Sequence, residues 1–240
     1  MHKTSTKKVI KKVVKKSDLE AFSKAGKETY NKETVNAPKK ILGTLMDGKK
    51  IAKKEIFGLM EKESDSKIDM KTPFVLIFAT DLNGEKELMP REFLYSLLQG
   101  CLAVNIKVVV VDTQQPSDIN NLGELTDKHE GHVIWYNPGT DNSGKNREEK
   151  EIDRLLMAAD MAVVFNSHLE LINLLMSYGV VLVSEDRSPL LENYKPNEET
   201  GNSFLYKKRD LWSVYASLVR ALESYKFPYD WNNIVRKLYK

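Results

Sequence analysis

The chain has 240 residues, of which 41% are hydrophobic and 30% are charged, and its formal net charge is only +3. This supplies enough apolar content for one sizeable core, and the near-balanced charge does not indicate a nucleic-acid-binding protein. The single cysteine, Cys101, excludes an internal disulfide, and no apolar run approaches the roughly 20 residues that span a bilayer. Because the N-terminus lacks the apolar core of a signal peptide, we expect a soluble protein of the cytoplasm.

Residues 1–35 form the most strongly biased segment, in which lysines alternate with the apolar pairs Val9-Ile10 and Val13-Val14. On a helix this pattern gives a narrow apolar stripe and a basic face. One interpretation is an arm that contacts an anionic partner, such as a membrane surface, a nucleic acid or an acidic protein. The other is a solvated, partly disordered arm, which we favour because isolated helices this short are marginal and their like charges repel.

We expect the folded domain to cover residues 36–240. In its first part, short apolar pieces between Ile41 and Met60 predict separate docking helices ahead of the sheet. Continuous apolar runs then follow, as in strands buried on both faces of a parallel sheet. The predicted strands are Phe74 to Ala79, Ile106 to Val111, His132 to Tyr136, Met161 to Phe165 and Val180 to Val183.

Helical patterns separate these strands, and two more helices follow the last one. The predicted helices begin at Pro90, Ser117 and Glu149, then cover Leu171 to Tyr178, Leu211 to Leu222 and Trp231 to Tyr239. This alternation predicts an α/β fold with a doubly wound, Rossmann-like parallel sheet. Ligands bind at the C-terminal edge of such sheets. No G-x-G-x-x-G pattern is present, so we expect neither a dinucleotide site nor a cofactor.

Several segments resemble motifs of the starch and glycogen synthases. Residues Ala159 to Ser167 are similar to their ADI-strand-PS segment, and Ser177 to Val183 to their RYG-strand segment. Residues Asn193 to Phe204 resemble their NPETGxGTGF stretch. The loop Asp81 to Lys86 stands where that family has its RLTxQKG loop. The common order and spacing of these motifs carry the resemblance, which extends from Asn36 to the C-terminus.

The resemblance implies the GT-B architecture, in which two Rossmann-like domains enclose the active site. The C-terminal domain of that family holds the nucleotide-sugar donor, usually ADP-glucose. This chain resembles the donor-binding half alone. The resemblance therefore implies a nucleotide sugar or a glycan as ligand, and a protein partner that supplies the missing N-terminal domain.

The family contacts the donor diphosphate with an arginine and a lysine from the first loop. Lys86 matches the lysine, and it is either a phosphate-binding ammonium or an ordinary exposed lysine of a lysine-rich chain. Asp81 stands at the arginine position. A carboxylate beside a diphosphate raises the energy of the complex where a guanidinium would lower it.

A second family loop follows the fourth strand and carries a glutamate that contacts the donor sugar. Glu170 matches this glutamate, but the Pro-Cys-Gly-Leu sequence that accompanies it is missing. We favour the alternative that Ser167 and Glu170 form a capping box for the next helix. His168 is either a donor or base at the mouth of the site or an exposed loop histidine.

A third family loop, Thr-Gly-Gly, follows the fifth strand. Because its glycines have no side chains, the backbone can approach the phosphates closely. Here the loop contains Glu185, Asp186, Arg187 and Pro189, and Pro189 has no N–H to donate. Arg187 either acts as a phosphate ligand or pairs with its acidic neighbours.

The scaffold motifs are therefore present while most donor-site motifs are altered. We expect a catalytically degenerate glycosyltransferase-like domain that binds a nucleotide sugar or a glycan weakly, without assigned catalytic residues. Two alternatives stay open: a non-catalytic protein-interaction module, and a divergent hexosyltransferase that uses Lys86, Glu170 and Arg187 in rearranged roles. One cysteine and scattered histidines offer no metal-ligand spacing.

Overall fold

Six strands form one parallel sheet in the order β3-β2-β1-β4-β5-β6. The structure is a computed structural model that describes residues 38–64, 67–82, 86–114, 122–129, 131–138, 149–165 and 169–239. The strand order reverses between β1 and β4, which confirms the predicted doubly wound sheet. The strands are β1 Phe74–Phe78, β2 Lys107–Val111, β3 Val133–Tyr136, β4 Met161–Val164, β5 Val181–Glu185 and β6 Ser203–Tyr206.

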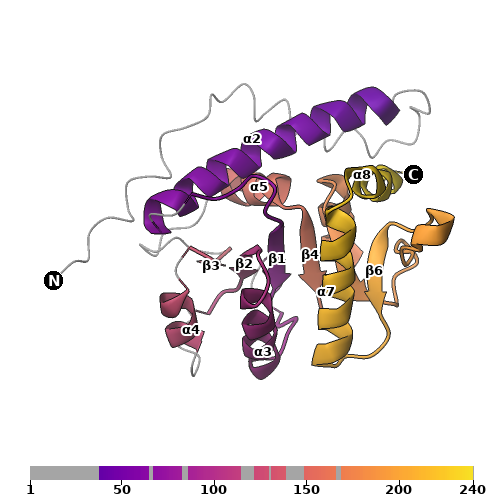
Figure 1. The fold of residues 1–240 in the computed structure, drawn as a ribbon. Helices are drawn as coiled ribbons and strands as arrows, with labels where there is room; N and C mark the ends of the chain where they lie inside the picture. The colour runs from indigo at the N-terminus through magenta and orange to yellow at the C-terminus, as the bar shows by residue number, and fades with distance from the viewer. Residues whose placement is uncertain are drawn as a thin grey trace.

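Helices cover both faces of this sheet (Figure 1). The core on one face joins β-strand side chains such as Val75 and Ile77 to α3, α7 and α8. The core on the other face joins Phe74 and Leu76 to α2, α5 and α6. The helices are α2 Pro38–Ser64, α3 Arg91–Leu102, α4 Leu122–Lys128, α5 Glu149–Ala158, α6 Leu169–Ser177, α7 Leu211–Tyr225 and α8 Pro228–Lys237, with a 3₁₀ turn η3 at Pro196–Glu198.

The five predicted strands are present within one or two residues of their expected ends. Strands β1, β2 and β4 are buried at every position, as their unbroken apolar runs predict. Strand β6 was not predicted, because its four residues lie within the segment matched to a family motif. The predicted basic arm, residues 1–35, and the start of the predicted helix at Ser117 lie outside the described residues.

Helix α2 corrects the prediction of several short docking helices, since it is one continuous helix of 27 residues. Its buried face includes the apolar Phe57 and Met60 but also Lys49 and Lys53, which are only 6% and 4% exposed. Because two of the buried positions are lysines, the apolar residues of this segment do not show one continuous helical spacing. The sequence therefore did not predict a single long helix.

The two buried lysines attach α2 to the N-terminal edge of the sheet. Lys49 Nζ donates to the carbonyl oxygens of Ala159 at 2.6 Å and Tyr178 at 2.9 Å. Lys53 Nζ lies 2.6 Å from Asp160 Oδ2, the same oxygen that accepts from the N–H of Phe74 at 2.9 Å. Burial lowers the pKa of Lys49 to about 8. Helix α2 is thus joined to the residues that precede β1 and β4.

Cys101 is buried in α3, and burial raises the pKa of its thiol to about 12. Across the described parts of the chain, no helix combines the length and apolarity needed to cross a bilayer.

Candidate functional site

The C-terminal ends of the six strands form the edge where a sheet of this topology binds ligands. The reversal of strand order between β1 and β4 lies at the middle of this edge. The loops that follow β1 and β5, and the first turn of α6 after β4, meet there because these three strands are parallel neighbours. The topology therefore brings three predicted site residues, Lys86, Glu170 and Arg187, to one edge.

The loop after β1 folds back on itself. The N–H of Asp81 donates to the carbonyl oxygen of Lys86 at 3.0 Å, and Thr80 pairs with Glu87 in an antiparallel bridge. Lys86 is exposed, so its ammonium reaches solvent at this edge. The same hydrogen bond keeps the backbone of Asp81, at the family's arginine position, opposite that of Lys86.

The loop after β5 is organised by a buried carboxylate. Glu185 is 2% exposed, and its carboxylate contacts two arginines. Arg187 Nε lies 2.8 Å from Glu185 Oε1, and Arg209 Nη2 lies 2.8 Å from Oε2. The side chain of Arg187 is 63% exposed, but its guanidinium is already paired with a charge of its own loop.

A second buried carboxylate closes the end of β2. Asp112 is fully buried and pairs with Arg91, the first residue of α3. Burial raises the pKa of Asp112, while the neighbouring Arg91 guanidinium and the N–H of Gln114 act against that rise. Arg91 and Arg209 were missed by sequence analysis. The available signal was an acidic residue directly after a buried apolar run, which requires a cationic partner.

Aromatic side chains fill the edge at the end of β4. The ring centroids of Phe93 and Phe165 are 4.6 Å apart, and those of Phe165 and Tyr206 are 6.3 Å apart. The Tyr206 hydroxyl donates to the carbonyl oxygens of Val164 at 2.9 Å and Phe165 at 2.8 Å. Burial raises the pKa of Tyr206, so it keeps its proton. These contacts anchor the end of β4 to β6.

Two hydroxyl groups at the same edge are buried without a hydrogen-bond partner among the described residues. They are Thr80 Oγ1, shortly after the end of β1, and Ser184 Oγ, at the second-to-last residue of β5. An unpaired buried hydroxyl carries a desolvation cost, and these two oxygens have almost no surface that a ligand could reach.

Glu170 lies exposed in the first turn of α6. A carboxylate there interacts favourably with the positive end of the helix dipole, which accounts for the residue without a ligand. Ser167 and His168 lie outside the described residues, and so does the predicted capping box. Within the described ranges, no group of three His, Cys, Asp or Glu side chains is placed to hold a metal ion.

Comparison with known proteins gave matches to structures alone. No protein-family model matches this sequence, and no curated protein matches it. The catalytic domain of starch synthase IV from Arabidopsis thaliana, bound to ADP and acarbose, matches with a TM-score of 0.57 and 16% identity, over 80% of this chain and 38% of that one.

Two further structures match less closely. Sucrose-phosphate synthase from Thermosynechococcus elongatus gives a TM-score of 0.46 and 13% identity over 72% of this chain and 41% of that one. S. aureus TarM, in complex with UDP and saccharide ligands, gives a TM-score of 0.47 and 10% identity over 70% of this chain and 32% of that one. The described chain therefore spans less than half the length of the structures that it matches.

These matches concern the fold. The chain has the Rossmann-like α/β fold of the GT-B glycosyltransferases, over the extent of one domain of such an enzyme. The predicted resemblance to starch synthases is confirmed at that level. At 16% identity, the match to starch synthase IV gives no information about the substrate or activity of this chain.

Proposed function

We propose that this chain is a glycosyltransferase-like domain with a degenerate nucleotide-sugar site, which does not transfer sugar by itself. Sugar transfer builds negative charge on the departing diphosphate, and catalysis requires cations and N–H donors aimed at that charge. The observation that carries the proposal is the buried carboxylate of Glu185, which engages the guanidinium groups of both Arg187 and Arg209.

The other charges of this edge support the same proposal. Arg91 is neutralised by the buried Asp112. Asp81 and Asp186 add negative charge to the loops after β1 and β5, while Lys86 remains as an exposed cation. A diphosphate would meet carboxylates at short range, where each like-charge contact costs on the order of 1 kcal/mol or more.

Packing at the end of β4 also supports the proposal that the nucleotide-sugar site is degenerate. The contact between Phe93 and Phe165 fills the point where the strand order reverses. We propose that the binding that remains is weak and rests on Lys86, an exposed cation of this edge. An anionic ligand such as a nucleotide sugar is the class that this cation fits.

Calorimetric titration with ADP and with ADP-glucose tests the proposal. We expect dissociation constants no tighter than about 1 mM, corresponding to about 4 kcal/mol, and no effect of the glucose on affinity. We also expect no sugar transfer to a glucan acceptor. Sugar-dependent binding, or turnover in the same preparation, would overturn the proposal in favour of a divergent active hexosyltransferase.

The substitution Glu185→Gln tests the electrostatic argument directly. Because it removes the negative charge that pairs with Arg187 and Arg209 and offsets one of their two positive charges, we expect ADP to bind about tenfold more tightly at low salt, and less so at high salt. Glu223→Gln is the matched control. It makes the same change in net charge at an exposed ion pair with Lys226, at the other end of α7. Equal ADP affinity in the two variants would contradict the assigned site.

A protein partner at this edge is the second candidate function. Trp212, in the first turn of α7, is 77% exposed, and Lys207, Lys208 and Arg209 precede it. Large exposed aromatic side chains are typical of protein interfaces. If ADP binds neither the wild type nor the Glu185→Gln variant, this interaction module becomes the better account of the edge.

A further inference from the structure

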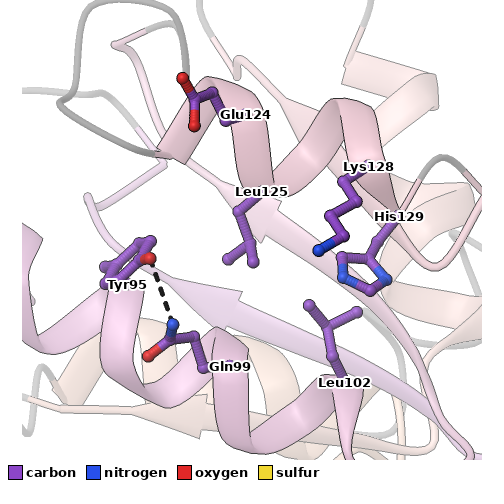
Figure 2. Close-up of a pocket in the computed structure, with 7 residues that line it drawn as sticks. All are labelled: Tyr95, Gln99, Leu102, Glu124, Leu125, Lys128 and His129. Atoms are coloured by element: carbon purple, nitrogen blue, oxygen red, sulfur yellow. Dashed lines mark hydrogen bonds between the residues drawn. The ribbon is translucent and has the colours of Figure 1, made fainter.

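A pocket of about 600 Å³ opens between α3 and α4 (Figure 2). Its α3 wall carries Tyr95, Gln99 and Leu102, on the helix that leads away from the C-terminal edge. None of the residues assigned to the nucleotide site lines it. It is an open depression whose lining is more polar than apolar, so a ligand bound there would stay partly exposed to solvent.

The floor of the pocket is apolar and rests on the core. Leu102 from α3 and Leu125 from α4 are half-buried, and both pack against the core cluster of this sheet face. Figure 2 shows both side chains pointing into the space between the helices. A ligand seated there would cover apolar surface that the protein leaves partly exposed to water, which favours an apolar body.

One end of the pocket is cationic. Lys128 and His129, at the C-terminal end of α4, extend side by side toward the space (Figure 2). Glu124, one helical turn before Lys128, points its carboxylate away from the lysine. The ammonium group is therefore directed at the pocket and not at the acidic residue of its own helix.

Hydrogen-bonding groups line the opposite wall. The Gln99 side-chain amide donates to the Tyr95 hydroxyl at 3.1 Å. This leaves the phenolic proton of Tyr95 and the carbonyl oxygen of Gln99 to pair with a ligand or with water. The wall thus presents donors from Tyr95 and Gln99 and the Gln99 carbonyl oxygen as an acceptor.

We propose that this pocket binds a small organic anion, a carboxylate or a phosphate monoester on an apolar body. Lys128 and the imidazole of His129 would hold the anionic group by charge-assisted hydrogen bonds. Leu102 and Leu125 would contact the apolar body, and the Tyr95 hydroxyl would donate to a polar atom of the ligand. This site is separate from the proposed nucleotide site and does not depend on it.

The test uses the fluorescent anion anilinonaphthalene sulfonate, displaced in turn by octanoate, octyl phosphate and octanol. We expect saturable dye binding that both octyl anions displace and that neutral octanol does not. The more effective of the two anions identifies the preferred head group. The full chain is used throughout, and circular dichroism verifies that each variant is folded.

Lys128→Met keeps most of the length of the side chain and removes its charge. We expect it to weaken the binding of dye and of octyl anions about tenfold, since a hydrogen-bonded charge is lost. Lys195→Met is the matched control, because it makes the same change in net charge at an exposed lysine near β6, at the other end of the sheet, and it should bind the dye as the wild type does. Leu125→Ala should weaken the dye and octanoate together.

Two results would overturn the proposal. One is a Lys128→Met variant that binds the anions as tightly as the Lys195→Met control. The other is displacement of the dye by octanol as effective as by octanoate, which would indicate a non-specific apolar surface. Neither result bears on the ADP titrations, so this site and the proposed function fail independently.

Discussion

Replacing Asp160 with alanine is expected to lower the free energy of unfolding by about 3–5 kcal/mol. Asp160 Oδ2 contacts Lys53 Nζ at 2.6 Å and accepts from the N–H of Phe74 at 2.9 Å. The Lys53 side chain is 5% exposed, so the variant leaves a buried ammonium without its carboxylate and a buried N–H without its acceptor. Both effects destabilise the folded chain.

Urea unfolding followed by circular dichroism measures this effect. Glu223→Ala is the control, since it breaks an ion pair with Lys226 whose two side chains are 64% and 59% exposed. Such surface pairs contribute about 0–1 kcal/mol. The double variant Lys53→Met, Asp160→Ala removes both charges of this ion pair, and we expect part of the lost stability to return.

The result also decides the extent of the folded domain. Lys53 belongs to α2, and Asp160 directly precedes β4. A cost near that of the Glu223→Ala control would mean that α2 is only loosely attached and that the domain begins after it. A large cost with partial rescue would support the proposed domain of residues 36–240, with α2 as an integral part.

Replacing Gly201 with alanine is expected to destabilise the chain by about 2–4 kcal/mol. Gly201 has a φ of 89°, and an added Cβ would lie 2.4 Å from the carbonyl oxygen of Asn193. The neighbouring backbone is held by hydrogen bonds, including Lys195 N–H to Thr200 O at 3.0 Å and Tyr194 N–H to Ser203 O at 2.7 Å. The clash is with backbone, so a side-chain rotation cannot relieve it.

Gly58→Ala provides the control for this substitution. Gly58 lies inside α2, and an added Cβ there would have no atom within 4 Å. Alanine is the better helix former, so we expect Gly58→Ala to stabilise the chain by about 0.5–1 kcal/mol. The melting temperatures of the two variants should therefore move in opposite directions. A neutral or stabilising Gly201→Ala would contradict the described path of residues 193–203.

The strands and their parallel arrangement could be predicted because each element has a recognisable pattern within its own short stretch of sequence. Runs such as Phe74–Phe78 and Lys107–Val111 are apolar enough to be recognised without their partners, and helical spacing separates them. The helix predicted to end at Tyr178 is followed by Gly179, whose φ of 65° explains why glycine stands there. Strand β6 was not predicted, because its residues lie within the segment that was matched to a family motif.

The site was only partly visible in the sequence. The exchange of glycines for Glu185, Asp186 and Pro189 could be seen at once, because it changes residue types within a single loop. The partner of Glu185 could not, since Arg209 is 24 residues away and meets it only where β5 and β6 lie side by side.

The sequence by itself thus determined the order of strands and helices. It also determined that the glycines of the family's phosphate loop are replaced. Both features depend only on residues that are neighbours along the chain. The tertiary structure alone decided that Lys49 and Lys53 are buried, that Arg187 and Arg209 share one carboxylate, and that a pocket opens between α3 and α4. The physical reason is distance along the chain: burial and ion pairing depend on groups brought together by packing, and no local pattern records them.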